Sequence, residues 1–70
     1  MNIKFAIRLK ELREEKGLSH AKLAKELGNK VTKSGIAHWE VGNRIPNLVA
    51  CIILADYFKV SLDFLAGREE

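Results

Sequence analysis

Residues 19–40, which read SHAKLAKELGNKVTKSGIAHWE, decide the fold of this chain. Their first half predicts a helix of about two and a half turns. Ser19 can cap the start of this helix, and Gly28 suits the left-handed residue that commonly ends one. The apolar residues between them recur at helical spacing, which indicates one buried face: Leu23, Ala24 and Leu27.

A second helix is predicted after the turn, with Thr32 as its cap. Its neighbouring side chains divide into two sets: Val31, Ile36 and Trp39 inward, and Lys33, Ser34, Ala37 and His38 outward. The outward set consists mainly of hydrogen-bond donors. Gly35 has two interpretations: a poorly optimised surface position, or bare backbone that lets the helix approach a groove closely.

Three further helices are predicted around this pair. An amphipathic pattern covers residues 4–16. Asn47 can cap a fourth helix, and Ser61 can cap a last one over residues 62–66. The inward face of the fourth helix is expected to supply most of the core: Leu48, Cys51, Ile52, Leu54, Ala55 and Phe58.

Length and composition agree with one small helical domain. The chain has 70 residues, of which 47% are hydrophobic and 30% charged, close to the smallest size that a single core stabilises. The predicted fold is all-α: a compact five-helix bundle forming a single domain over residues 1–70, with its core in about residues 5–67. No apolar run is long enough to span a membrane, and residues 1–7 lack a signal peptide's apolar core, so a cytoplasmic protein is expected.

Positive charge is concentrated in the first two thirds of the chain. Residues 1–46 contain ten Lys and Arg against five Asp and Glu, whereas residues 47–70 contain two against four. The basic part includes the helix pair of residues 19–40, as expected if that pair meets phosphates. Taken alone, the same charge also fits an ordinary solvated surface.

Residues that could carry catalysis or bind a metal are few and far apart. His20 and His38 lie on different predicted helices, and the sequence has no Cys-x-x-Cys or His-x-x-x-His spacing. Cys51 lies in an apolar run without a basic neighbour to activate its thiol. We therefore expect no enzymatic activity, no metal, no cofactor and no small-molecule ligand.

A set of landmarks extends along nearly the whole chain: Leu23-Ala24-x-x-Leu27-Gly28, Val31-Thr32-x-x-x-Ile36-x-x-Trp39-Glu40-x-Gly42, Pro46, Leu54-Ala55 and Val60-Ser61-Leu62-Asp63-Phe64-Leu65. In this order they resemble the Cro/repressor (Xre-type) helix-turn-helix family. The resemblance implies a lambda-repressor-like DNA-binding fold in which the second and third helices form the helix-turn-helix. Asn29 and Lys30 make the turn two residues longer than is usual in the family.

The resemblance also implies roles for individual side chains. Matched to the family motif, base contacts fall on Lys33, Ser34 and His38. Phosphate contacts fall on residues of the two helix starts and of the loop after the recognition helix: Ser19, His20, Thr32, Asn43 and Arg44. His20 stands where the family typically has Gln. Arg13 and Glu40 match a salt bridge that holds the recognition helix in place.

These features predict sequence-specific binding of double-stranded DNA by a small transcriptional regulator, a repressor that acts as a homodimer on a two-fold operator. A stripe in the fourth helix, Val49, Ile53 and Tyr57, is apolar where the family is commonly polar. Either that helix is buried all round or the stripe, with Phe64 beside it, is a dimer interface. The alternative function is a protein-interaction module, such as an antitoxin or a partner-dependent regulator, that uses the same stripe.

Overall fold

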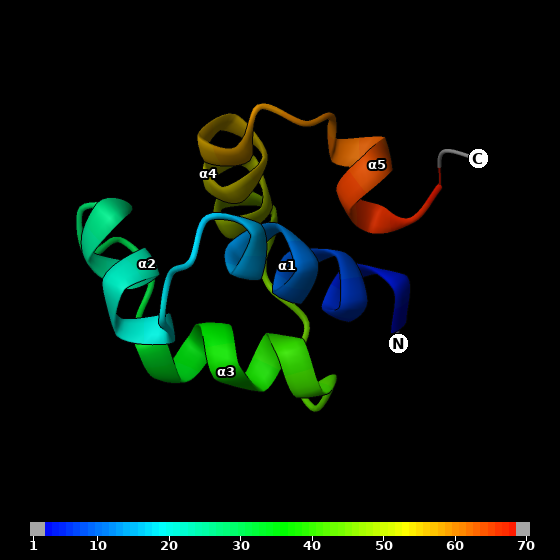
Figure 1. The fold of residues 1–70 in the computed structure, drawn as a ribbon. Coiled ribbons are helices and arrows are strands. Elements are labelled where there is room, and N and C mark those ends of the chain that lie inside the picture. The colour runs from blue at the N-terminus through cyan, green and yellow to red at the C-terminus, as the bar shows by residue number, and fades with distance from the viewer. Residues whose placement is uncertain (1–2, 69–70) are drawn as a thin grey trace.

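The computed structural model describes residues 3–68. This part of the chain forms five helices and no strand, which confirms the all-α prediction: α1 (Ile3–Glu15), α2 (His20–Glu26), α3 (Lys33–Val41), α4 (Leu48–Phe58) and α5 (Leu62–Ala66). In Figure 1, α1 crosses the middle of the bundle, with α3 along one side and α4 and α5 on the other. None of these helices is long and apolar enough to cross a membrane.

The core takes one large side chain from each helix. The largest fully buried side chains are Leu9, Leu23, Ile36, Leu54 and Leu65, in the order α1 to α5. Short helices of this kind are stable only when such apolar faces pack together. The fold therefore depends on all five helices at once, and α3 is held by α1 and α2, which it contacts directly.

Four of the helices begin at side-chain caps, at the residues that the sequence predicted. A side-chain oxygen of each cap accepts a hydrogen bond from a backbone N–H three residues later, over distances of 2.8–3.0 Å: Ser19, Thr32, Asn47 and Ser61. Lys59 ends α4 in the left-handed conformation, at φ 59°, although it is not glycine. The left-handed conformation costs free energy in any residue with a Cβ.

The longer turn between α2 and α3 is absorbed by two consecutive left-handed residues. Gly28 has φ 69° and Asn29 has φ 61°. The backbone N–H groups of these two residues donate to the carbonyls of Lys25 and Ala24, each over 3.0 Å, which is the hydrogen-bond pattern of a Schellman motif. Asn tolerates the left-handed region better than most residues, so the turn closes and Val31 is still buried.

The predicted inward face of α4 was partly wrong. Leu54, Ala55 and Phe58 are buried, but Leu48 is 67% exposed and Ile52 is 41% exposed. Cys51 is only half-buried. The reason lies in the composition of α4, where Asp56 is the only charged residue. A helix that is apolar on nearly every side does not reveal from its sequence which side faces the core.

Candidate nucleic-acid interface

The outward face of α3 presents polar side chains at its start. Lys33 and Ser34 are exposed, and His38 is half-buried on the same side as Ser34, one turn further along. Ile36 is buried, and Trp39 packs against the core. The division of this helix into an apolar face and a polar face therefore agrees with the sequence, and the polar face is free to meet a ligand.

The two helix starts also present hydroxyl groups. Ser19 and Thr32 are exposed, and each hydroxyl oxygen accepts a backbone hydrogen bond at the start of its helix. The hydroxyl hydrogen can still be donated outward. A Cβ on Gly35 would lie 3.1 Å from Oγ1 of Thr32, so the glycine leaves room for this cap. The structure thereby supplies a local packing reason for Gly35.

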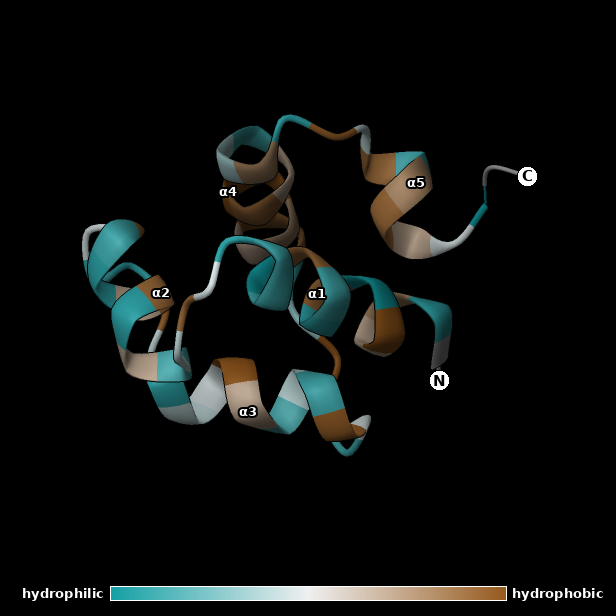
Figure 2. Cartoon of the chain, viewed as in Figure 1, coloured by the Kyte–Doolittle hydropathy of each residue, from teal (hydrophilic) through white to brown (hydrophobic). Residues whose placement is uncertain are grey.

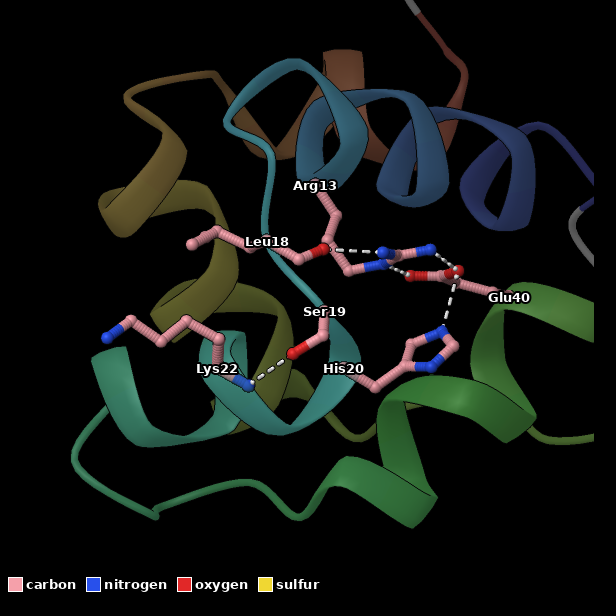
Figure 3. Close-up of polar contacts among 6 residues, drawn as sticks. All are labelled: Arg13, Leu18, Ser19, His20, Lys22 and Glu40. Atoms are coloured by element: carbon pink, nitrogen blue, oxygen red, sulfur yellow. Dashed lines mark hydrogen bonds and ion pairs between the residues drawn. The ribbon is translucent and has the colours of Figure 1, made fainter.

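The ion pair implied by the resemblance is present and joins α1 to α3 (Figure 3). Nε of Arg13 donates to Oε2 of Glu40 over 2.7 Å, and Nη2 donates to Oε1 over 3.0 Å. Nη1 of the same guanidinium donates to the carbonyl of Leu18 over 2.6 Å. The side chain of Glu40 is only 4% exposed. The bidentate pair with Glu40 orients α3 against α1. The bond to Leu18 holds the segment that leads into α2.

His20 contacts the same carboxylate, which the sequence did not predict. Its Nε2 lies 3.1 Å from Oε1 of Glu40, and its side chain is 39% exposed (Figure 3). Because a carboxylate only accepts hydrogen bonds, Nε2 must be the donor. In the neutral ring Nδ1 then has no hydrogen to donate, so the predicted phosphate contact of His20 requires the protonated imidazole. Three helices thus meet at Glu40.

This arrangement shifts the pKa of Glu40 below its ordinary value. Burial alone would raise the pKa of Glu40, but the hydrogen bonds from Arg13 and His20 and their positive charge outweigh the burial. The hydrogen bond to Glu40 in turn raises the pKa of Arg13. The charged pair is therefore the form that the folded state favours.

The lowered pKa predicts a specific loss of stability in acid. The stabilisation from Glu40 is fully present above the unfolded-state pKa of about 4.3 and is lost as pH falls through the lower folded-state pKa. Glu40→Gln should therefore be less stable at pH 7 and lose less stability between pH 5 and pH 2 than the wild type. Urea denaturation across this range measures the effect, and Glu14→Gln, which changes an exposed carboxylate of α1, is the matched control. Parallel acid curves for the wild type and Glu40→Gln would contradict the assignment.

The loop after α3 brings together two residues that the sequence assigned separately. Nδ1 of His38 lies 3.1 Å from Oδ1 of Asn43. The backbone N–H of Asn43 also donates to the carbonyl of His38 over 3.2 Å. Arg44 follows and is exposed. His38, which was predicted to contact a base, is therefore hydrogen-bonded to Asn43, which was predicted to contact a phosphate.

The predicted dimer stripe is mostly occupied by contacts within the chain. Ile53 and Tyr57 are half-buried and pack against the core, and Nζ of Lys16 lies 5.3 Å from the centre of the Tyr57 ring. The Arg8 guanidinium lies 4.4 Å from the centre of the Phe64 ring and donates to the Phe64 carbonyl. Only Val49, at 64%, is strongly exposed. Of the stripe, Val49 is thus the member that is most open to a partner.

A different set of apolar side chains is exposed beside it. We call this set the apolar face: Ile45, Leu48, Ile52 and Leu62. Leu48 and Leu62 border one shallow pocket, which Phe5 and Cys51 also line. Ile45 borders a neighbouring pocket, and Phe5 and Cys51 line that pocket too. In Figure 2, α4 and α5 are coloured mostly as hydrophobic, whereas α2 is mostly hydrophilic. The apolar and polar surfaces thus belong to different helices.

The geometry and the sequence place this chain in a known class. Residues 9–65 match the helix-turn-helix protein family, and the chain belongs to that family. The match covers all of α2, α3 and α4, with the predicted recognition helix α3 near its centre. No solved structure matches this chain significantly.

Three curated proteins are similar to this chain. The HTH-type transcriptional regulator AnsR of Bacillus subtilis (strain 168) is 44% identical over 63 residues, which cover 90% of this chain and 53% of AnsR. The HTH-type transcriptional activator BcrR of Enterococcus faecalis is 32% identical over 97% of this chain and 32% of BcrR. The SPbeta prophage-derived uncharacterized HTH-type transcriptional regulator YonR of Bacillus subtilis (strain 168) is 38% identical over 87% of this chain and 55% of YonR. The chain therefore spans about half of AnsR and YonR, and less of BcrR.

Sequence reasoning missed three features of this surface. The contact of His20 with Glu40 joins residues twenty positions apart, and no local pattern signals it. The His38–Asn43 bond follows from the spacing of a helix end, five residues apart around Gly42, which is a usable signal. Val41, at 74% the most exposed large hydrophobic side chain of the described residues, lies one turn beyond His38 on α3.

Proposed function

We propose that this chain binds double-stranded DNA sequence-specifically and acts as a transcriptional regulator. The observation that carries the proposal is the polar face of α3, which the Arg13–Glu40 pair holds outward on a helix-turn-helix. An α-helix with its side chains is about 10–12 Å across, which suits a major groove about 12 Å wide, and the nine residues of α3 supply two full turns to lie in it. The similarity to three proteins named as transcriptional regulators or activators supports the same function.

In this proposal each side chain has a defined task. Lys33, Ser34 and His38 read base edges from the first two turns of α3. The hydroxyls of Ser19 and Thr32, together with Arg44, bind phosphates on either side of the groove. His20 joins them when its ring is protonated. These contacts would set the register of α3 on the duplex before any base is read.

We further propose a homodimer that represses transcription in the cytoplasm. One helix-turn-helix reads only a few base pairs, so specificity in a genome requires two copies about 34 Å apart. The apolar face is the exposed surface best suited to join them, because its large apolar side chains are open to solvent and three of them, Ile45, Leu48 and Leu62, border neighbouring pockets. A repressor needs only to occupy its operator, and the polar face of α3 is a surface that could bind DNA for this purpose.

The proposed function is tested by affinity for duplex DNA as a function of salt. Wild-type binding to random duplex should weaken steeply as salt rises, because Lys and Arg release counterions from phosphates. On a site selected from random duplexes, Lys33→Ala should cost about 1–3 kcal/mol and relax base choice at one position. Lys59→Gly, which removes an exposed cation at the end of α4, outside the helix pair of α2 and α3, is the matched control.

The same measurements distinguish the second candidate function. A protein-interaction module, such as an antitoxin, would bind duplex weakly with a shallow salt dependence and would not select a site. Equal losses for Lys33→Ala on selected and random duplex would instead make Lys33 a phosphate contact. The observation that keeps this second function open is the exposed apolar face, which suits a protein partner as well as a second copy.

A further inference from the structure

We propose that Asn43 sets the base specificity of His38 by fixing its tautomer, so that His38 reads an exocyclic amino group, the N6 amine of adenine or the N4 amine of cytosine. The inference rests on the proposed function. It assigns to Asn43 a positioning task instead of the phosphate contact that the sequence predicted.

The chemistry follows from the atoms that meet. Oδ1 of Asn43 is a carbonyl oxygen and can only accept a hydrogen bond, so Nδ1 of His38, 3.1 Å away, must carry the hydrogen. A neutral imidazole has one N–H group, which leaves Nε2 with a lone pair. Nε2 forms no hydrogen bond with any of residues 3–68. The ring nitrogen available to DNA is therefore an acceptor.

Asn43 is held in position from two directions. Its backbone N–H donates to the carbonyl of His38 over 3.2 Å, in the hydrogen-bond pattern that ends α3. Gly42, at φ 82°, supplies the left-handed residue that this pattern needs. The side-chain bond therefore closes a short ring between two residues whose backbones are already fixed, and little conformational freedom is lost in forming it.

The acceptor character of Nε2 determines what His38 can read. In the major groove, adenine N6 and cytosine N4 are donors, whereas guanine offers only acceptors at N7 and O6. Placing the lone pair of Nε2 against guanine would leave two acceptors facing each other. Without Asn43, His38 could adopt either neutral tautomer, so Nε2 could be a donor or an acceptor. His38 would then discriminate less between the bases.

The test uses base analogues, because every base pair presents both donors and acceptors. Selection from random duplexes with wild type and His38→Ala identifies the position that His38 reads. The measurements are made at pH 8.5, where an imidazole is ordinarily neutral. Removing the amino group of the base at that position should lower wild-type affinity about fivefold or more. Replacing purine N7 there by carbon should change the affinity little.

Variants of the loop show whether Asn43 positions the ring of His38 or only contacts DNA itself. Asn43→Asp keeps the acceptor and should keep the dependence on the amino group, although its negative charge lowers affinity for all duplexes. Asn43→Ala should abolish that dependence. Arg44→Ala, in the same loop, should lower the affinity for all duplexes by the same factor. The dependence of affinity on the amino group of the base should remain. Loss of affinity on N7 replacement in the wild type, or an unchanged dependence in Asn43→Ala, would overturn the proposal.

Nitrogen-15 NMR of the His38 ring in the free protein gives a readout that needs no DNA. The Nδ1–H form is expected in the wild type and in Asn43→Asp, and its loss is expected in Asn43→Ala. If the protein binds duplex but the ring carries its hydrogen on Nε2, the tautomer assignment fails and the proposed function stands. If the Nδ1–H form is found without salt-dependent DNA binding, the proposed function fails, and the base-reading role of His38 fails with it.

Discussion

Arg13→Ala is expected to destabilise the fold by about 3–5 kcal/mol, because it leaves the carboxylate of Glu40 buried and without its main partner. The lost bonds are the two from the guanidinium to Glu40 and the one to the carbonyl of Leu18. A domain of this size has a total stability of about 3–5 kcal/mol. The variant should therefore be largely unfolded at 25 °C, as measured by circular dichroism and urea denaturation.

A control variant shows whether the loss of stability in Arg13→Ala exceeds the loss caused by removing an exposed charge. Glu14→Ala, one residue along α1 and exposed, should change the stability by less than about 0.5 kcal/mol. The double variant Arg13→Met with Glu40→Leu should recover most of the loss, since an apolar pair leaves no buried charge unpaired. A stably folded Arg13→Ala with an unchanged urea midpoint would mean that the ion pair is not structural. DNA affinity of the double variant then reports whether α3 still has the right orientation.

The helices and their ends were predictable because their signals are local. Ser19, Thr32, Asn47 and Ser61 each cap a helix through a bond to a backbone N–H only three residues away. The polar face of α3 was predictable because Ile36 and Trp39 mark its apolar side. Within such short distances along the chain, sequence determines structure without reference to the rest of the fold.

The parts that were not predictable depend on contacts between distant segments. His20 and Glu40 meet only because α2 and α3 pack against each other, and nothing in either segment specifies the other. The orientation of α4 is set by its packing against α5 and in the shared core, since its own sequence is apolar almost all round. That is why Leu48 and Ile52 were predicted to face inward although both are exposed, and why two alternatives were left open for the stripe that contains Ile53.

Leu48→Asp is expected to abolish dimerisation and to weaken binding to a two-fold operator about 100-fold, if the apolar face joins two copies. Leu48 is 67% exposed, so a charge at that position leaves the core of the monomer intact. The loss on the operator arises because each copy must then bind alone, without the high effective concentration that a linked partner provides. Sedimentation measures the dimer, and titration of a two-fold site against a half-site measures the coupling.

Ile53→Asp distinguishes the apolar face from the stripe that the sequence predicted. Ile53 is half-buried and packs against the core, so an aspartate there should unfold the monomer and not merely separate two copies. Val49→Asp changes an exposed position of the stripe and should leave both folding and dimerisation intact. If Val49→Asp separates the copies and Leu48→Asp does not, the stripe is the interface after all. If the wild type sediments as a monomer at high concentration and shows no coupling on a two-fold site, the homodimer is wrong, and the apolar face must serve a different protein partner.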